Sequence, residues 1–330
     1  MQYRYLGKSG LQISALSFGS WVTFGSQVDI DLATELMTAA YDAGVNFFDN
    51  AEVYNAGKAE TIMGEVIKKT GWKQKDLVLS TKIFWGGKGP NDRGLSRKHI
   101  IEGLDASLAR MRVDYVDLVF AHRPDIHTPI EETVRAFNQV INQGKAFYWG
   151  TSEWSAQQIM EAYSIARQEH LIPPLMEQPQ YNMFHRERVE IEYQRLYSEF
   201  GLGTTIWSPL SSGLLTGKYN EGIPKNSRGD LEGYEWLRDR FTNEEAKNQI
   251  EKVKLLSVVA SDLDASVAQL AIAWCLHNPN ISTVITGASK ISQVEENMKA
   301  IDLLDKLTPD IVEHVESILD NKPEAPSDLR

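Results

Sequence analysis

The chain has 330 residues, and its 34 Lys and Arg against 45 Asp and Glu leave a formal net charge of −11. A charge of this sign argues against nucleic acid or anionic lipid as a general partner, although it does not exclude a local basic site for a phosphate. With 42% hydrophobic and 24% charged residues, the composition is that of an ordinary globular protein able to bury a sizeable core.

The single cysteine, Cys275, cannot form an intrachain disulfide, and its place in the run QLAIAWCLHN predicts a small buried thiol rather than a nucleophile. Residues 1–15 carry no apolar core of a signal peptide. The longest stretch without charged residues, Ala265 to Ser289, contains polar residues and a proline, which indicate helix, turn and strand rather than a membrane span. We therefore expect a cytoplasmic location.

The first elements are a β-hairpin about Gly7–Gly10, predicted from YRYLGKSGLQIS, and then eight short β-rich runs that alternate with helical patterns. The runs are ISALSFGSW, ending near Trp21; VNFFDN, ending at Asp49; DLVLSTK, ending at Lys82; YVDLVFAH, ending at His122; AFYWGTSE, ending near Ser152; PLMEQPQY, passing Gln178; GTTIWSPL, ending near Ser208; and STVITGAS, ending near Ser289.

Helical patterns with start and stop signals lie between these runs. DIDLATELMTAAYDAG begins with acidic residues and stops at Gly44, and PIEETVRAFNQVINQG begins with Pro129 and two glutamates and stops at Gly144. The same scheme describes SRKHIIEGLDASLARM, SAQQIMEAYSIARQEH and SVAQLAIAWCLHN.

Eight strands alternating with helices predict an α/β fold, a (β/α)8 TIM barrel. We expect one domain over residues 1–330, with the hairpin closing the barrel bottom and residues 321–330 forming an exposed tail. A doubly wound sheet is the alternative, but it needs a G-x-G-x-x-G turn after the first strand, and SFGSWVTFGS does not supply one.

Polar side chains end three consecutive predicted strands, namely Asp49, Lys82 and His122, and Tyr54 lies in the loop after the first of them. In TIM barrels the active site lies at the C-terminal ends of the strands, so all four side chains can face one pocket. Taken singly, each has a structural explanation: a turn residue, a lysine in water, a satisfied core histidine and a packed tyrosine. Only their joint placement favours a catalytic site.

This set of side chains suits carbonyl reduction. A tyrosine hydroxyl titrates near 10 and is a poor acid alone, and a neighbouring lysine ammonium is expected to lower that pKa. A carboxylate would hold the lysine charged, and an imidazole could hydrogen-bond a carbonyl oxygen. Together the four predict protonation of a carbonyl oxygen while hydride arrives at its carbon.

Other signals are weaker. GLLTGKY resembles a phosphate-binding P-loop, but it is one residue short between the glycines, and Tyr219 follows the lysine. GGKGPNDRG is glycine-rich without fingerprint spacing, and we interpret it as a lid or a subunit contact. No H-E-x-x-H motif and no cysteine cluster indicates a metal.

Six stretches, FFDNAEVY, STKIFWGG, FAHRPD, YWGTSEWS, WSPLSSGLLTGKY and ITGASKISQVEEN, resemble the aldo-keto reductases. Within that family they are similar to the branch that contains the β-subunits of voltage-gated potassium channels, plant-like and microbial members above all. The similarity runs from YLGKSGLQIS to nearly the last helix. The family's Tyr, Lys, Asp and His match Tyr54, Lys82, Asp49 and His122. Animal channel β-subunits have Asn at the position of His122, so this chain has the full reductase set.

The resemblance implies an NADPH cofactor extended across the barrel top. It implies that Ser152 and Gln178 bond the carboxamide and that Trp207 stacks on the nicotinamide. Many family members have Asn where this chain has Glu153, which leaves the role of Glu153 open. Further implied cofactor contacts are Ser20, Trp21, Gln27 and Asp49 on the near side; Ser208, Pro209, Leu210, Ser211, Ser212 and Gly213 at the pyrophosphate; Lys218 and Arg228 near phosphates; and Gly287, Ser289, Gln293, Glu296 and Asn297 at the adenosine end.

The residues themselves support part of this assignment. GASKISQVEENM reads as a strand end, a turn and a helix start, whose amides and macrodipole favour an anion. The alternative is an ordinary solvated helix face. The resemblance implies that Lys218, Ser289 and Gln293 lie near the 2′-phosphate.

Two functions follow. The first is NADPH-dependent reduction of aldehydes or reactive ketones, with Trp21, Tyr54, Trp85, His122 and Trp154 lining a substrate pocket that favours apolar or aromatic aldehydes. The second is a regulatory protein like a channel β-subunit, with the cofactor as a redox sensor and a channel-type membrane protein as partner. The resemblance implies a homotetramer. Because the chain starts almost at the first hairpin, we expect no long N-terminal inactivating segment.

Overall fold

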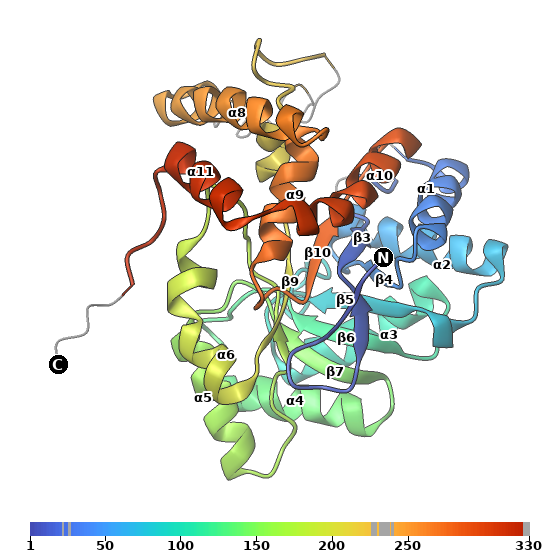
Figure 1. Ribbon diagram of the computed structural model, residues 1–330. Coiled ribbons are helices and arrows are strands. Elements are labelled where there is room, and N and C mark those ends of the chain that lie inside the picture. The colour runs from blue at the N-terminus through green and yellow to red at the C-terminus, as the bar shows by residue number, and fades with distance from the viewer. Residues whose placement is uncertain (22, 26–27, 226–229, 231–237, 239–240, 326–330) are drawn as a thin grey trace, which may run out of the picture.

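The structure is a computed structural model that describes residues 1–325, apart from 22, 26–27, 226–229, 231–237 and 239–240. Eight parallel strands close into a barrel in the order β10-β3-β4-β5-β6-β7-β8-β9, and helices surround it (Figure 1). The predicted (β/α)8 barrel is therefore confirmed. Its strands are β3 (Leu16–Gly19), β4 (Phe47–Asp49), β5 (Val78–Ile83), β6 (Val116–Ala121), β7 (Ala146–Thr151), β8 (Met176–Glu177), β9 (Gly203–Ile206) and β10 (Thr283–Thr286).

The predicted N-terminal hairpin is present as β1 (Tyr3–Tyr5) paired antiparallel with β2 (Gln12–Ser14). Gly7 in its turn has a φ of 52°, and a Cβ there would lie 2.4 Å from the carbonyl oxygen of Gly201, just before β9 begins. The side chains of Leu6 and Ile13 belong to the hydrophobic cluster inside the barrel. The hairpin thus closes the end of the barrel where the strands begin, opposite the end where they finish.

Several helices begin where a side chain satisfies one of the first free backbone amides. Asp29 accepts a hydrogen bond from the amide of Leu32, and Ser155 and Ser266 form capping boxes. The helices are α1 (Ile30–Asp42), α2 (Lys58–Thr70), α3 (Arg97–Met111), α4 (Ile130–Asn142), α5 (Ala156–Gln168), α6 (Gln194–Phe200), α8 (Glu244–Asp262), α9 (Val267–His277), α10 (Ile291–Met298) and α11 (Pro309–Leu319).

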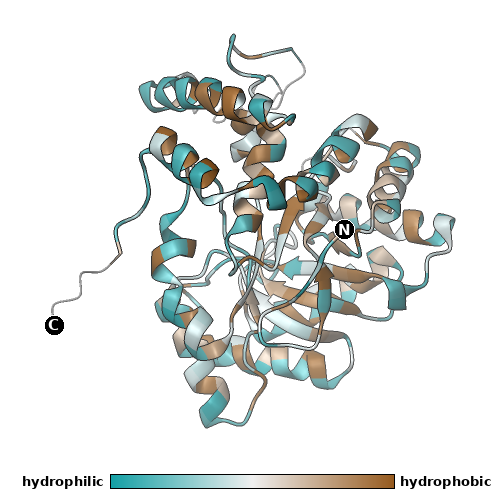
Figure 2. Cartoon of the chain, viewed as in Figure 1, coloured by the Kyte–Doolittle hydropathy of each residue, from teal (hydrophilic) through white to brown (hydrophobic). Residues whose placement is uncertain are grey.

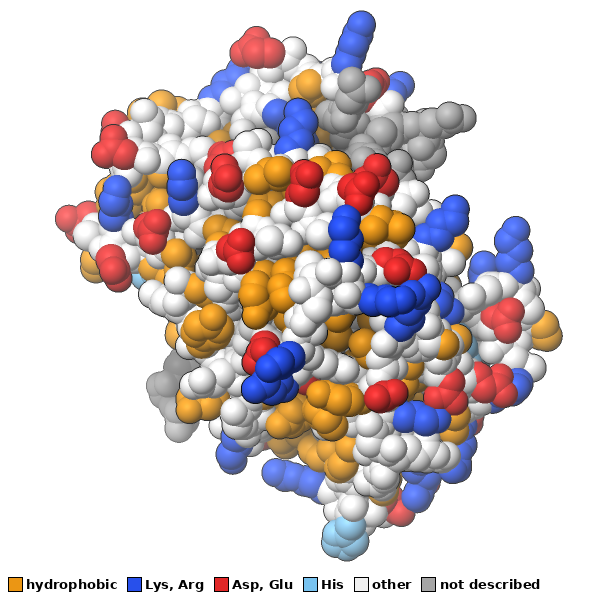
Figure 3. Space-filling model, turned by 90° about the vertical axis from the view of Figure 1, so that its right-hand side faces the viewer, with side chains coloured by type: hydrophobic (Ala, Val, Ile, Leu, Met, Phe, Trp, Pro, Cys, Tyr) orange, Lys and Arg blue, Asp and Glu red, His pale blue; other side chains and the backbone are white. Residues whose placement is uncertain are grey.

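The larger core lies between the strands and the helices around them. Phe137 of α4 stacks on Trp149 of β7 with ring centroids 4.8 Å apart, and both are fully buried. Burying one such aromatic side chain contributes about 1.5–3 kcal/mol. Hydrophobic residues accordingly gather on the strands, while the helices carry hydrophilic residues on their outer faces (Figure 2). On the face drawn in Figure 3, acidic and basic side chains are interspersed rather than gathered by sign.

Cys275 is fully buried in α9, as its sequence context predicts, and burial raises the pKa of its thiol. Among the described residues, no single helix has the length and apolar character needed to cross a membrane; α8 and α9 meet the test only as a pair, bent by 87°. Of the expected tail, residues 321–325 form neither helix nor strand, and 326–330 lie outside the described residues.

Candidate functional site

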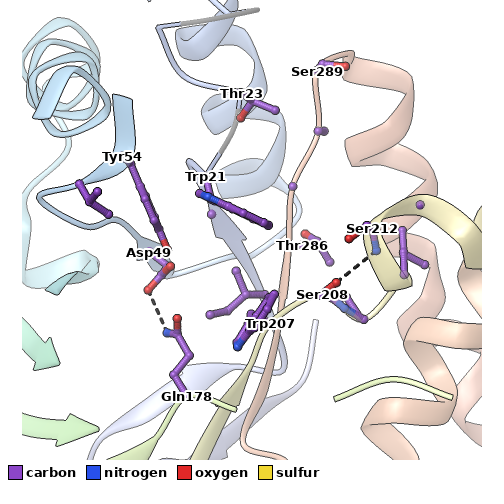
Figure 4. A pocket seen from close by; sticks show the side chains of 18 of the residues that line it. Trp21, Thr23, Asp49, Tyr54, Gln178, Trp207, Ser208, Ser212, Thr286 and Ser289 are labelled. Carbon is purple, nitrogen blue, oxygen red and sulfur yellow. Dashed lines mark hydrogen bonds between the residues drawn. The ribbon is translucent and has the colours of Figure 1, made fainter. Parts of the chain in front are cut away.

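A cavity of about 1,100 Å³ lies at the C-terminal ends of the barrel strands. Figure 4 shows its two sides: Asp49 and Tyr54 lie on one, Ser289 and Ser212 on the other, and Trp21 and Trp207 between them. A volume of this size is slightly above the usual range for ligand pockets, about 300–1,000 Å³. It is sufficient for an extended molecule and a smaller second one.

Lys82 is fully buried and does not itself line the cavity, but it contacts two residues that do, Asp49 and Tyr54. Its Nζ donates to Asp49 Oδ2 at 2.6 Å, to the carbonyl oxygen of Asn50 at 2.7 Å and to Tyr54 Oη at 3.1 Å. The three contacts use all three N–H groups of the ammonium. Burial lowers the pKa of Lys82, and the adjacent carboxylate of Asp49 opposes that shift. Neighbouring parallel strands, β4 and β5, bring the two charges together.

Asp49 is held by further donors that fix its orientation. Its Oδ1 accepts hydrogen bonds from Ser80 Oγ at 2.8 Å and from Gln178 Nε2 at 3.1 Å (Figure 4). Ser80 precedes Lys82 by two residues on β5, so both side chains point into the barrel. Gln178 follows β8, on the far side of the barrel. Asp49 therefore links the lysine to the opposite wall of the cavity.

Tyr54 is the first residue of a turn of 3₁₀ helix, Tyr54–Gly57. Within this turn, Asn55 and Ala56 are left-handed, with φ of 48° and 52°. Burial raises the pKa of Tyr54 well above 10, and the negative charge of Asp49 raises it further. The net shift of this pKa therefore runs opposite to the lowering expected from a neighbouring lysine, because burial and the charge of Asp49 outweigh the nearby positive charge of Arg123. Tyr54 thus keeps its proton at neutral pH, as a proton donor must.

His122 directly follows β6 and is 5% exposed. Its ring centroid lies 5.9 Å from that of Tyr54 and 5.0 Å from that of Trp85. Burial, and then the positive charges of Lys82 and Arg123, hold its pKa well below 6.5. The imidazole is therefore neutral near pH 7, and one of its ring nitrogens can donate a hydrogen bond toward the cavity.

Ser152 and Gln178, at the ends of β7 and β8, lie side by side. Ser152 Oγ donates to the carbonyl oxygen of Gln178 at 2.9 Å, and the Gln178 amide reaches Thr205 Oγ1 at 3.3 Å as well as Asp49. Both residues line the cavity. Amide and hydroxyl groups placed in this way suit a ligand carboxamide.

Trp207 forms the adjoining wall, with its ring 6.0 Å from that of Trp21 at an interplanar angle of 83°. Its Nε1 donates to Glu153 Oε1 at 2.9 Å, and the same oxygen accepts the amide of Gln180 at 2.6 Å. Glu153 Oε2 pairs with Arg188 at 2.7 Å. The sequence left the role of Glu153 open. In the structure Glu153 does not line the cavity, and its carboxylate holds the indole of Trp207 in position.

The loop after β9 contains several residues with positive φ. Ser208, Ser211 and Ser212 have φ of 58°, 47° and 59°, and Gly213 has a φ of 99°. The Ser212 amide donates to Ser208 Oγ at 3.2 Å (Figure 4). Only Leu210 and Ser211 form a right-handed and left-handed pair of the kind found in phosphate-binding concavities, and the amides of Ser211 and Gly213 bond to carbonyl oxygens within the loop. The fit to a pyrophosphate therefore rests on the residues of this loop that line the cavity rather than on free amides.

The far end of the cavity is formed by the segment between β10 and α10. The amide and hydroxyl of Ser289 both donate to Gln293 Oε1, at 2.9 and 3.4 Å. Lys290, not anticipated from the sequence, lines the cavity here as the N-cap residue of α10, and Lys218 and Lys225 line the cavity elsewhere. A positive side chain at the start of a helix suits a further phosphate group.

A sequence model of the Aldo/keto reductase family matches residues 15–320. The chain belongs to this family. The resemblance seen in its motifs is therefore confirmed, and aldo/keto reductases are oxidoreductases that generally bind NAD(P)H. Two similar relatives are called "Probable voltage-gated potassium channel subunit beta": one from Oryza sativa subsp. japonica, 57% identical, and one from Arabidopsis thaliana, 56% identical. Each match covers 331 aligned residues and 100% of both chains.

Most of the residues expected to meet the cofactor of this aldo/keto reductase line the cavity. Ser20 and Ser211 are buried beside the cavity without lining it. Gln27 and Arg228 lie outside the described residues. Those that line it are Trp21, Asp49, Ser152, Gln178, Trp207, Ser208, Pro209, Leu210, Ser212, Gly213, Lys218, Gly287, Ser289, Gln293, Glu296 and Asn297.

One expected substrate wall of the aldo/keto reductase is wrong. Trp154 is 1% exposed and does not line the cavity. The chain turns at Glu153, whose φ is 60°, and Trp154 enters the core, where its carbonyl oxygen accepts the hydroxyl of Tyr193 at 2.5 Å. Trp21, Tyr54, Trp85 and His122 do line the cavity.

Sequence reasoning also missed Arg123, which lines the cavity next to His122. The signal was present in FAHRPD, where Arg123 is the second polar residue after the end of β6. The glycine-rich GGKGPNDRG segment forms part of the cavity rim, where Trp85 and Arg93 make an antiparallel bridge.

Proposed function

We propose that this aldo/keto reductase reduces aldehydes or reactive ketones to alcohols with NADPH, in the cytoplasm. When bound, the cofactor would supply hydride to the carbonyl carbon. The protein's own residues would hold the carbonyl group, exclude water and deliver a proton to its oxygen. The observation that carries this proposal is the contact chain from Asp49 through Lys82 to Tyr54, with a 3.1 Å hydrogen bond from the ammonium to the phenol oxygen.

Each residue of the catalytic group has a distinct role. Lys82 donates to the Tyr54 oxygen, which leaves the phenol proton free to be donated toward a carbonyl oxygen in the cavity. As that proton leaves, the ammonium stabilises the developing phenolate, and Asp49 keeps the ammonium in place. His122, as a neutral donor, would orient the carbonyl oxygen and stabilise its growing negative charge.

The preference for NADPH over NADH rests on the cationic far end of the cavity. Lys290 adjoins Ser289 and Gln293 at this end, and Lys218 and Lys225 add positive charge to the lining of the same cavity. A 2′-phosphate needs positive charge and hydrogen-bond donors, and this end supplies both. Ser152 and Gln178 would bind the carboxamide, and Trp207 would stack on the nicotinamide.

The test is a panel of aldehydes and ketones followed by loss of NADPH absorbance, with NADH in parallel. Tyr54→Phe should lower kcat by about two to four orders of magnitude, as expected for a lost general acid, while NADPH binding by fluorescence is retained. Near-normal turnover in Tyr54→Phe would remove Tyr54 from its role. No activity on any carbonyl would contradict the reductase proposal itself.

A second candidate is a regulatory subunit for a channel-type membrane protein, with the cofactor as redox sensor. The observation that favours it is the full-length identity of 57% and 56% to proteins named as probable channel β-subunits. This role would use a homotetramer, a closed ring in which each copy presents two different patches. The reductase role needs no ring, because Asp49, Tyr54, Lys82 and His122 come from one chain, so both roles can coexist.

Multi-angle light scattering distinguishes these possibilities. A mass near four chains would support the ring. A monomer at micromolar concentration that still reduces aldehydes would leave the reductase intact and remove the main support for a channel partner. A tetramer that reduces no carbonyl would place the regulatory role first.

A further inference from the structure

The substrate side of the cavity carries more positive charge than a neutral carbonyl compound requires. Arg123 follows His122 at the end of β6, and Lys88 and Arg93 belong to the loop after β5; all three line the cavity. Among the described residues, none of these three cations pairs with a carboxylate: Arg93 donates to the carbonyl oxygen of Gly87, and Arg123 donates to neutral oxygens.

Arg123 is the most informative of the three because it is half-buried. Its Nη1 donates to the carbonyl oxygen of His122 at 2.5 Å and to Ser152 Oγ at 3.2 Å. A guanidinium has five donors, and Nε and Nη2 of Arg123 have no acceptor among the described residues. A partly buried cation is costly without an anionic partner, and a planar guanidinium fits a carboxylate in a bidentate manner.

The position of Arg123 relative to the reacting groups is also set by contacts. Its Cζ lies 5.6 Å from the Trp85 ring, whose centroid is 5.0 Å from that of His122, and His122 in turn lies 5.9 Å from Tyr54. Tyr54, His122, Trp85 and Arg123 therefore form one continuous wall. A ligand with its carbonyl oxygen at the first two can extend along Trp85 to the guanidinium.

The other charges near this wall do not pair with Arg123. The carboxylate of Asp49 is already paired with Lys82 at 2.6 Å. Glu296 also lines the cavity, but it lies on α10, which follows Ser289 on the opposite side (Figure 4). Asp92 lies in the loop that carries Lys88 and Arg93, where its Oδ2 accepts the amide of Gly89 at 2.9 Å, so it offsets part of the positive charge of the rim. His122 is neutral, which leaves Arg123 as a cation with no carboxylate partner among the described residues.

We propose that the preferred substrate carries a carboxylate in addition to its aldehyde or ketone group, and that Arg123 binds this carboxylate, with Arg93 and Lys88 attracting it from the rim. This inference rests on the proposed reductase function. In the reaction the carbonyl carbon gains hydride from the reduced cofactor and the carbonyl oxygen gains the proton of Tyr54. The carboxylate is unchanged and serves only for recognition.

A competing explanation is that Arg123 only helps to keep His122 neutral, and it makes a different prediction. In that case, replacing Arg123 would change the reduction of charged and uncharged substrates equally. If Arg123 binds the substrate, its loss would act mainly on acidic substrates. The ratio of the two kcat/KM values therefore distinguishes binding from a positioning role.

The test compares 4-formylbenzoate with its methyl ester, two aldehydes that differ in charge at one end. We expect native kcat/KM to favour the acid by about 10- to 100-fold, the range for hydrogen bonds to a charged group. Arg123→Gln should abolish this preference. Arg93→Gln, at an exposed position, should reduce it in part. Arg195→Gln is the matched control, because Arg195 is exposed on α6 and does not line the cavity. This variant should retain the preference for the acid.

A binding measurement keeps the inference separate from catalysis. Isothermal titration of benzoate and benzamide into protein saturated with NADP⁺ should show tighter binding of benzoate, with the difference lost in Arg123→Gln. If the protein prefers benzoate but reduces neither aldehyde, the proposed reductase function is contradicted and the proposed carboxylate site at Arg123 is supported. Equal kcat/KM values for acid and ester in the native protein, or a preference for the acid that remains in Arg123→Gln, would contradict the proposed carboxylate site.

Discussion

Glu177 is a carboxyl group whose protonation we expect to be strongly linked to folding stability. It ends β8, next to Gln178, and is fully buried. The hydroxyl of Thr151 donates to its Oε2, and the amide of Trp154 donates to Oε1 at 3.3 Å. Burial raises the pKa of Glu177 from 4.5 to about 8, and the hydrogen bond from Thr151 only partly offsets this. We predict that Glu177→Gln becomes increasingly stabilising as the pH rises.

The sign and size follow from proton linkage. Because the folded-state pKa lies above the unfolded one, the stability that Glu177 contributes is fully present below pH 4.5 and is lost as pH rises through about 8. Each pH unit within this window corresponds to 1.36 kcal/mol. Between pH 5 and pH 8 the native protein should therefore lose about 4 kcal/mol relative to Glu177→Gln. A glutamine keeps both contacts, since its oxygen can accept from Trp154 and its amide can donate to Thr151.

The assay is urea unfolding of both proteins at several pH values from 5 to 8, or thermal midpoints if unfolding is irreversible. The quantity of interest is the difference in unfolding free energy between variant and native protein, because other titrating groups cancel in it. Glu35→Gln, which makes the same substitution at an exposed position of α1, is the matched control. A difference for Glu177→Gln that does not vary with pH would refute the reasoning.

The remaining predictions concern the cavity. His122→Asn should retain the cofactor and slow carbonyl reduction about tenfold or more, the scale for losing a well-placed donor; unchanged steady-state kinetics would return His122 to a packing role. NADPH should bind more tightly than NADH, and Lys218→Ala should narrow that gap in a fluorescence titration; equal native affinities would contradict the assigned 2′-phosphate site. Glu153→Leu should weaken NADPH binding more than Glu153→Gln does, because only leucine leaves the Trp207 Nε1 without an acceptor. Equal affinities of the two variants would show that Glu153 does not position the indole.

The sequence was sufficient for the architecture because its signals were local and repeated. Alternation of β-rich runs and capped helical patterns predicted all eight barrel strands, even β8, which is only Met176–Glu177. The catalytic candidates were found because a parallel barrel brings strand ends to one face, so Asp49, Lys82 and His122 needed no knowledge of side-chain geometry.

What the sequence did not predict depends on backbone turns and on burial. The left-handed residue Glu153 sends Trp154 into the core, and nothing in EWS signals that turn. The pKa of Tyr54 is raised by burial and by Asp49 and lowered by Arg123, and only the distances in the folded chain decide which effect is larger. Arg123 is the second polar residue after β6, and only the backbone beyond the strand decides whether such a residue faces the cavity.

The barrel closes between its first strand and its last, where Val284 of β10 pairs with Leu16 of β3. During synthesis, the wall that joins Trp21 to Ser289 therefore cannot exist until β10 has left the ribosome. Until then, the edge of β3 that pairs with β10 has no partner strand. Bringing β3 and β10 together closes a loop of most of the chain, which costs conformational entropy before the contacts between the two strands form. A cofactor that needs both sides of the cavity cannot guide early folding; it can only stabilise a barrel that has already closed.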